Sequence, residues 1–233
     1  MSIQPNWTYD EFKHIGVDFA NPQQVQAYEA RQHTNIEREK QLVQRLNIRV
    51  GDTVVEYGPG TGAFTLAAAR AGARVTAVDI SRAMLDYAQS KAVQMGITSV
   101  TFVNSGFLNY QPRAESVDFV VTQFAFHHLP DFWKAAALQR IARSLKQGGI
   151  FYLHDVVFSF ETDQYEQHLN EWIEAFSSDP GDSFSRTDFE QHIRDEYSTF
   201  SWILEGLLQR TGFSIVEQNY LAPTYAEYLC RKD

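Results

Sequence analysis

The chain has 233 residues, 44% of them hydrophobic, which fits one α/β domain with an added cover and argues against a disordered chain. Its formal net charge is -9, and residues 151–233 carry 5 Lys and Arg against 16 Asp and Glu, so a nucleic-acid partner is not expected. The single cysteine, Cys230, excludes an intramolecular disulfide and a metal site built from cysteines.

Residues 1–45 predict a helical cover that precedes the core. Asn21-Pro22 is typical of a helix start, and Thr34–Glu37 has the spacing of a capping box that opens a second helix. Aromatic side chains are frequent here, and we expect them to help cover a substrate site; they are Tyr9, Phe12, Phe19 and Tyr28.

From residue 46 to about residue 160, short apolar strands alternate with amphipathic helices. The expected strands are 53–57, 74–78, 100–103, 117–122 and 150–157, and the expected helices are 64–71, 81–95 and 130–145. Strands and helices that alternate at this spacing predict a doubly wound, mostly parallel sheet.

A helical insertion over residues 160–200 interrupts this alternation. It carries a helix at 165–176 and a second capping box at Thr187–Glu190. A helix at 200–210 and strands at 213–218 and 225–230 then close the chain, which makes seven strands. We therefore expect one domain, 1–233, with an N-terminal cover (1–45), a cofactor-binding core (46–160), an insertion over the substrate site (160–200) and a closing segment (200–233).

A glycine turn follows the first predicted strand, in the stretch Val54–Phe64 (VVEYGPGTGAF). No Gly-Lys-Ser/Thr follows it, which excludes a Walker loop. Glu56, two residues before the first glycine, is unfavourable next to a pyrophosphate but suits a positively charged group. Asp79, at the end of the second strand, is placed to accept hydrogen bonds from ribose hydroxyls. A nucleoside with a cationic amino-acid tail meets both requirements.

Four segments together resemble the class I S-adenosylmethionine-dependent methyltransferases, most closely the UbiE-like enzymes of small molecules. They are Val54–Gly62, Val75–Asp79, Ser116–Leu129 (SVDFVVTQFAFHHL) and Leu145–Gly149 (LKQGG). The resemblance covers about residues 45–160 and returns at the last two strands. It implies a Rossmann-like fold, S-adenosyl-L-methionine as cofactor and S-adenosyl-L-homocysteine as product.

The resemblance also implies roles for individual residues. Glu56 would bind the ammonium group of the cofactor, directly or through water, and Asp79 would bind its ribose. Ile80 would pack on adenine, Gln123 would face the methionine tail and Phe124 would border the methyl group. The glycines of the turn would let the backbone pass beneath the methionine; they are Gly58, Gly60 and Gly62.

One departure from the family lies after the third strand, where a Gly-Asp pair is common and the Asp accepts a hydrogen bond from the adenine amino group. This chain has Ser105 and Gly106 there, followed by Phe107. Adenine would then be held by the backbone, by the Asn104 or Ser105 side chain, or by packing against Phe107.

The candidates for a general base are His127, His128, His154, Asp155 and Glu161, of which His127, His128 and Asp155 are the ones we select. The alternative is that one histidine caps the next helix while the other packs in the core, and that Asp155 is a hydrogen-bonded loop residue. Adjacent histidines point apart and no third ligand is evident, so no metal site is expected.

The function expected from these patterns is methyl transfer to a small-molecule acceptor by in-line displacement. The alternatives are a non-catalytic protein that binds S-adenosylmethionine or S-adenosylhomocysteine, and an NAD-dependent oxidoreductase. The sequence shows no signal peptide and no bilayer-spanning run, so we expect a cytoplasmic protein without a membrane partner. It leaves open whether the protein is a monomer or a homodimer.

Overall fold

The structure is a computed structural model that describes residues 7–13, 25, 26, 28, 29, 36–177 and 185–233. Its strands are β1 (Thr53–Tyr57), β2 (Arg74–Asp79), β3 (Val100–Asn104), β4 (Val117–Gln123), β5 (Leu145–Phe158), β6 (Thr199–Phe200), β7 (Phe213–Ala222) and β8 (Tyr225–Lys232). Its helices are α2 (Ile36–Arg45), α3 (Ala63–Arg70), α4 (Arg82–Gln94), α5 (Asp131–Ser144), α6 (Tyr165–Ser177), α7 (Arg186–Asp195) and α8 (Ser201–Arg210), with 3-10 turns at Phe126–His128 and Thr162–Gln164.

The strands form one sheet in the order β3-β2-β1-β4-β5-β8-β7, and β6 pairs with β5 outside this path. Strands β1 to β5 run parallel, and β8 is antiparallel to both β5 and β7. The doubly wound, mostly parallel sheet is therefore confirmed. It has eight strands where the sequence predicted seven, because the two-residue β6 carries too short a pattern to be recognised.

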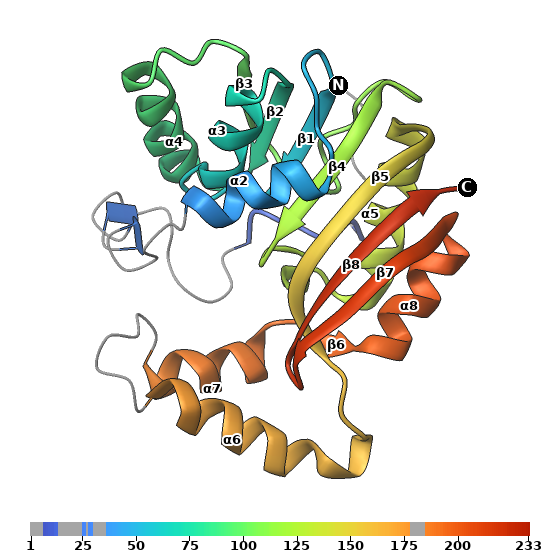
Figure 1. The fold of residues 1–233 in the computed structure, drawn as a ribbon. Helices are drawn as coiled ribbons and strands as arrows, with labels where there is room; N and C mark the ends of the chain where they lie inside the picture. The colour runs from blue at the N-terminus through green and yellow to red at the C-terminus, as the bar shows by residue number, and fades with distance from the viewer. Residues whose placement is uncertain (1–6, 14–24, 27, 30–35, 178–184) are drawn as a thin grey trace.

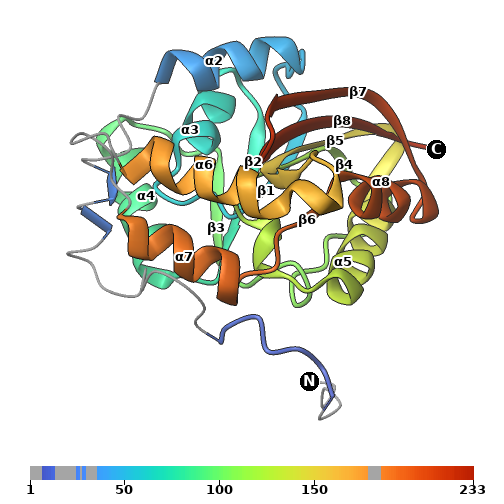
Figure 2. The same cartoon turned by 90° about the horizontal axis from the view of Figure 1, so that it is seen from below.

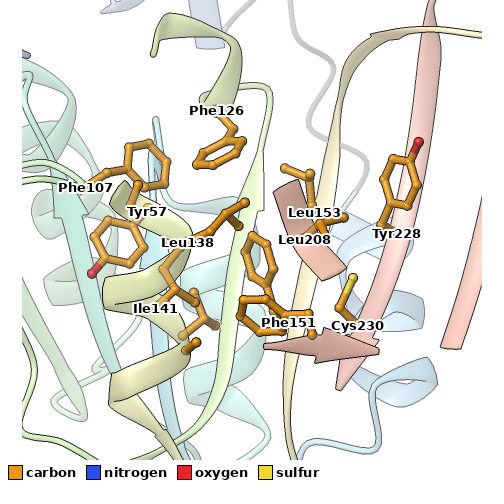
Figure 3. Packing of buried hydrophobic residues seen from close by; sticks show 14 of the residues in the cluster. Tyr57, Phe107, Phe126, Leu138, Ile141, Phe151, Leu153, Leu208, Tyr228 and Cys230 are labelled. Atoms are coloured by element: carbon orange, nitrogen blue, oxygen red, sulfur yellow. The ribbon is translucent and has the colours of Figure 1, made fainter. Parts of the chain in front are cut away.

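Helices cover both faces of the sheet (Figure 2). On one face, Leu42 and Val43 of α2 and Phe64 of α3 pack against Val54 of β1 and Tyr152 of β5. On the other face, a second cluster joins the sheet to α5 and α8 (Figure 3). Its labelled members are Tyr57, Phe107, Phe126, Leu138, Ile141, Phe151, Leu153, Leu208, Tyr228 and Cys230. Buried apolar residues from both faces of β1, β4 and β5 explain why these strands read as continuous hydrophobic runs.

Helices α6 and α7 form a separate pair beyond the end of β5, on the side toward which β4 points (Figure 1). They pack through a small cluster of their own, in which Trp172 and Ile173 of α6 contact Phe189 of α7 and Val156 of β5. Trp172 also donates a hydrogen bond from Nε1 to the Tyr225 hydroxyl, 3.0 Å away. The insertion is thus attached to the C-terminal ends of the parallel strands.

Several boundaries differ from the prediction, among them the end of β7, which lies at Ala222 rather than at residue 218. Strand β5 begins at Leu145, directly after α5, because Val117 pairs with Leu145 and Phe119 with Ile150, which accommodates residues 146–149 in a bulge. The cap of α7 is Ser185, whose hydroxyl accepts from the Asp188 amide while the Asp188 carboxylate accepts from the Ser185 amide. The capping box therefore lies two residues before the predicted Thr187.

Some predictions lie outside the described residues, among them the helix start at Asn21-Pro22, the cap at Thr34 and the aromatic Phe19. Within the described part, residues 36–45 form α2, in the segment where the sequence predicted a helix, and residues 25, 26, 28 and 29 are helical. No helix in the described ranges is long and apolar enough to cross a membrane.

Candidate functional site

A cavity of about 290 Å³ opens at the C-terminal ends of β1, β2, β3 and β4, the position where open α/β sheets bind ligands. Ten predicted site residues line it: Gly58, Gly60, Asp79, Ile80, Ser105, Gly106, Phe107, Gln123, Phe124 and His128. Four others do not line it: Glu56, Gly62, His127 and Asp155. Residues that the sequence did not assign to a cofactor site complete its wall, including Glu11, Lys13, Tyr57, Ser81, Met84 and Leu129.

The glycine turn adopts a backbone that side chains would obstruct. Gly58 has a φ of +68° and donates its amide to the Val78 carbonyl at 2.9 Å. A Cβ on Gly58 would lie 2.4 Å from the Cβ of Ala125, in the loop after β4. Gly62, with φ +85°, begins α3, and a Cβ there would lie 2.9 Å from the Cβ of Ala88. The turn is therefore held tightly between β1, β4 and α4.

Asp79 connects the glycine turn to the end of β2. Its Oδ1 accepts from the Ser81 amide at 2.8 Å, and its Oδ2 accepts from the Gly60 amide at 3.4 Å. Burial raises the pKa of Asp79 to about 6, although these backbone hydrogen bonds act in the opposite direction. The carboxylate borders the cavity, as expected for a group that binds ribose hydroxyls.

Glu56 lies behind the turn, only 2% exposed, and accepts a hydrogen bond from the Thr65 hydroxyl of α3. Burial, together with the nearby carboxylates of Glu39 and Asp79, raises its pKa to about 8, although the hydrogen bond from Thr65 acts in the opposite direction. Glu39, on α2, is also buried and has a raised pKa, and its Oε2 accepts from the Gln123 side-chain amide at 3.0 Å. Two buried carboxylates beside one end of the cavity favour a positively charged ligand group there.

Two side chains hold the turn after β3: Asn104, at the end of β3, and Glu11, from the N-terminal segment. Asn104 donates its side-chain amide to the Asp79 and Ile80 carbonyls, both at 2.9 Å, so this amide fixes the loop. The carboxylate of Glu11, in the N-terminal segment 7–13, accepts from the Leu108 amide at 3.0 and 3.1 Å. Because 97 residues separate Glu11 from Leu108, no local pattern along the chain could predict this contact.

Phe124 ends β4 in an uncommon conformation. Its φ is +51°, a value that costs energy in residues other than glycine, and its amide donates to the His154 carbonyl at 2.8 Å. Phe124 is 42% exposed and lines the cavity, and the centre of its ring lies 4.3 Å from the centre of the His154 ring. The strained backbone thus points an aromatic ring into the cavity, where the sequence places the methyl end of the cofactor.

The two adjacent histidines have different surroundings. His128 lines the cavity, and burial together with the nearby positive charge of His127 lowers its pKa well below the usual value. His127 is 7% exposed and contacts two carboxylates, through Nδ1 to Asp155 and through Nε2 to Glu196 at 3.1 Å. Burial alone would lower the pKa of His127, but these carboxylates raise it to about 9.

Both oxygens of the Asp155 carboxylate accept hydrogen bonds from buried groups of the protein. One oxygen accepts from the Phe126 and His127 amides at 2.8 and 3.1 Å, and the other accepts from the His127 ring and, at 2.7 Å, from the Val156 amide. These bonds, chiefly those with His127, hold the pKa of Asp155 below its usual value despite burial. Asp155, within β5, and His127 therefore bond to groups of the protein itself, and of the three selected candidates His128 lines the cavity.

The insertion adds two residues to this cluster, His192 and Glu196 of the α7 region. The Glu196 carboxylate contacts Nδ1 of His192, whose Nε2 lies 2.8 Å from the Ser198 hydroxyl. Ligand atoms of His127, His192 and Glu196 lie within 4.8 Å of one another, a grouping that the sequence could not reveal. Each ring nitrogen of His127 and His192 already has a protein partner, so the cluster is complete as a hydrogen-bonded chain.

Comparisons with known proteins agree with this geometry. Residues 54–149 match the methyltransferase domain family. An uncharacterized methyltransferase of Bacillus mycoides is 26% identical over 218 residues, which cover 92% of each chain.

Solved structures show the same fold. A SAM-dependent methyltransferase from Aquifex aeolicus superposes with a TM-score of 0.65 at 15% identity, over 91% of this chain and 99% of that one. Geranyl diphosphate C-methyltransferase from Streptomyces coelicolor, solved with S-adenosyl-L-homocysteine, gives a TM-score of 0.66 at 14% identity, over 84% of this chain and 76% of that one. The matched domain, the relatives that span most of this chain and the shared fold together support a class I S-adenosylmethionine-dependent methyltransferase.

Proposed function

We propose that this protein transfers a methyl group from S-adenosylmethionine to a small-molecule acceptor in the cavity described above. The observation that carries the proposal is the combination of charges around one turn. Asp79 borders the cavity on one side of the glycine turn, and the buried Glu56 and Glu39 lie behind it. These acidic side chains offer no positive charge to a pyrophosphate, whereas they suit a nucleoside whose tail carries an ammonium group, because such a group favours their charged forms.

The fit of the cofactor can be argued from the residues present. The hydroxyls of a ribose would bind Asp79, and the adenine would lie against Ile80 and the backbone of Gly106 and Phe107. The methionine tail would pass over Gly58 and Gly60 toward Gln123, which already bonds Glu39. Its ammonium group would be stabilised by Glu56 and Glu39, directly or through water, and this gain would offset the cost of burying two carboxylates.

When bound, the cofactor supplies an electrophilic methyl group whose sulfur leaves as a neutral thioether. The chain therefore has no developing anion to stabilise, and its main contribution is to hold the acceptor about 3–3.5 Å from the methyl carbon, in line with the breaking bond. Phe124 and His128 border this part of the cavity. Their positions favour an acceptor that approaches the methyl group from one side of the cavity.

His128 suits a positioning role better than proton removal. With its pKa far below neutral, the imidazole stays uncharged and holds a proton only weakly. We propose that it accepts a hydrogen bond from the acceptor and orients the attacking lone pair. An amine acceptor, whose lone pair needs no deprotonation, fits this chemistry better than an alcohol.

The acceptor itself is expected to be small and partly apolar. The cavity is lined by aromatic and aliphatic side chains such as Tyr9, Phe12, Met84 and Leu129. Pockets of this kind, with a few polar groups, are typical of small-molecule sites. The Streptomyces structure holds geranyl-S-thiolodiphosphate, so this fold accommodates a ligand with an apolar chain in that protein.

Two measurements test the proposal. Titration calorimetry with S-adenosylmethionine and S-adenosylhomocysteine should detect binding of both, and absence of heat with either would contradict it. Incubation with methyl-labelled cofactor and a metabolite extract should transfer label to an acceptor. Binding without any transfer would favour the alternative, a protein that senses the cofactor without catalysis, and binding of NAD alone would favour an oxidoreductase.

A further inference from the structure

Glu11 is a buried carboxylate that the proposed reaction has not yet used. It belongs to the N-terminal segment 7–13, is 7% exposed and lines the cavity. Besides the Leu108 amide, its Oε1 accepts from the Asn109 side-chain amide at 2.5 Å. Burying a carboxylate is costly unless it is well paired or has a task, so its presence at a ligand cavity needs an explanation.

The position of Glu11 is tied to the glycine at 106. A Cβ on Gly106 would lie 2.3 Å from both Cδ and Oε2 of Glu11, closer than any real contact. The carboxylate therefore occupies the space in which a side chain at position 106 would begin. In this chain the carboxylate at this place comes from the N-terminal segment.

This place lies at the nucleobase end of the cavity. If Asp79 holds the ribose, the base extends away from the glycine turn, between Ile80 and the backbone at Gly106 and Phe107. The edge of the base then faces the carboxylate of Glu11. Each carboxylate oxygen has two acceptor positions, so Oε2, which accepts only a share of the Leu108 amide, retains capacity for a further donor.

We infer that Glu11 accepts a hydrogen bond from the exocyclic amino group of the adenine, and thereby selects a 6-amino purine over a 6-oxo purine. The inference rests on the proposed function and adds a specificity-determining residue to it. A carboxylate only accepts, so an adenine amino group pairs with it, whereas the carbonyl oxygen of a hypoxanthine ring is repelled. Sites built around such a bond reject the unmatched analogue strongly, because a buried polar group is left unpaired.

A merely structural role for Glu11 would be to cap the turn at 107–109 through the Leu108 amide. The two roles differ in one measurable quantity, the ratio of affinities for S-adenosylhomocysteine and for its 6-oxo analogue, S-inosylhomocysteine. If Glu11 only caps the turn, replacing it changes both affinities by the same factor. If Glu11 recognises the base, replacing it changes their ratio. Titration calorimetry of the purified full chain measures both constants without any need for turnover.

The first variant is Glu11→Gln, whose amide oxygen keeps the bond to Leu108 while its NH₂ group donates to a 6-oxo base. We expect the wild type to prefer the 6-amino ligand by roughly tenfold or more, and Glu11→Gln to lose most of this preference. Asp10→Asn, one residue away and exposed, should keep the wild-type ratio. An unchanged ratio in Glu11→Gln overturns the inference but not the proposed function, whereas a wild type that binds neither ligand overturns both.

The second test moves the carboxylate from residue 11 to residue 106, its neighbour in the fold. Gly106→Asp alone should bind both ligands poorly, because the new side chain must displace the end of Glu11, 2.3 Å from its Cβ, and brings a second carboxylate beside it. Glu11→Ala should bind with little preference between the two ligands, and Glu11→Ala/Gly106→Asp should recover a preference for the 6-amino ligand. A double variant that binds like Glu11→Ala would contradict the placement of the base edge at this carboxylate.

Discussion

The Cα of Gly58 lies against the methyl group of Ala125, and a Cβ on Gly58 would come within 2.4 Å of it. The contact brings the end of β1 and the loop after β4 together at the base of the cavity. Ala125 has no rotatable side chain, so the backbone itself would have to move to admit a larger residue.

This contact predicts that Gly58→Ala is markedly harmful. Gly96→Ala is a matched control, because Gly96 has nearly the same φ, +67° against +68°, but nothing within 4 Å of an added Cβ. Both variants carry the cost of a side chain at positive φ, about 1 kcal/mol, and only Gly58→Ala adds the clash. Chemical denaturation and cofactor titration should show a larger loss for Gly58→Ala; equal losses would mean that the contact is relaxed in solution.

Asp79→Asn should weaken binding of S-adenosylhomocysteine by about 1–3 kcal/mol, because an amide presents fewer acceptors to the ribose hydroxyls and to the Gly60 and Ser81 amides. Calorimetry measures the change. Asp86→Asn, on the exposed side of α4 and paired with Arg82, should leave affinity unchanged. Unaltered affinity in Asp79→Asn would refute the placement of the ribose.

Cofactor binding should release a proton near neutral pH. The pKa of Glu56 is about 8 while no cation is near it, so the group is mostly protonated at pH 7. An ammonium ion favours the charged carboxylate, so binding lowers this pKa, and affinity should rise with pH between about 6 and 8.

Calorimetry in buffers of different ionisation enthalpy counts the released protons. Glu56→Gln should reduce this count, and Glu37→Gln, an exposed residue of α2 paired with Lys40, should not. The same proton release in Glu56→Gln and wild type would show that another group supplies it.

The folded state should lose stability as the medium becomes alkaline, because of His127. Its pKa in the folded chain, about 9, lies above the ordinary value near 6.5. The protonated ring therefore stabilises the fold fully below pH 6.5, and this stabilisation, up to about 3 kcal/mol, is lost as pH rises through 9.

His127→Gln removes the titrating ring but keeps a donor for Asp155. We expect lower stability at pH 6.5 and a flatter dependence of unfolding free energy on pH between 6.5 and 9, measured by urea denaturation. His168→Gln, on α6 and outside this cluster, should retain the wild-type slope. A wild-type slope in His127→Gln would assign the pH dependence to other groups, such as Glu56.

The predictions that succeeded rest on local patterns. The alternation of strands and helices, the Ser81 cap of α4 and the turn at Gly58–Gly62 follow from residues close together in the chain. The pattern of apolar residues identifies the strands whose last residues are Asp79 and Gln123. Because these strands are parallel, their C-terminal ends lie at one edge of the sheet. Boundaries failed where a bulge or a two-residue strand left no periodic signal, as in β5 and β6.

The sequence by itself determined the sheet, the glycine turn and the carboxylate at the end of β2, because spacing along a strand or helix decides which side chains share a face. Only the tertiary structure decided how Glu11 meets Gly106, how Glu39 approaches Glu56 and how His192 and Glu196 join His127. These contacts join segments that no periodicity relates. They form when burial forces polar groups from separate elements to satisfy one another, so they depend on how the elements pack rather than on any one of them.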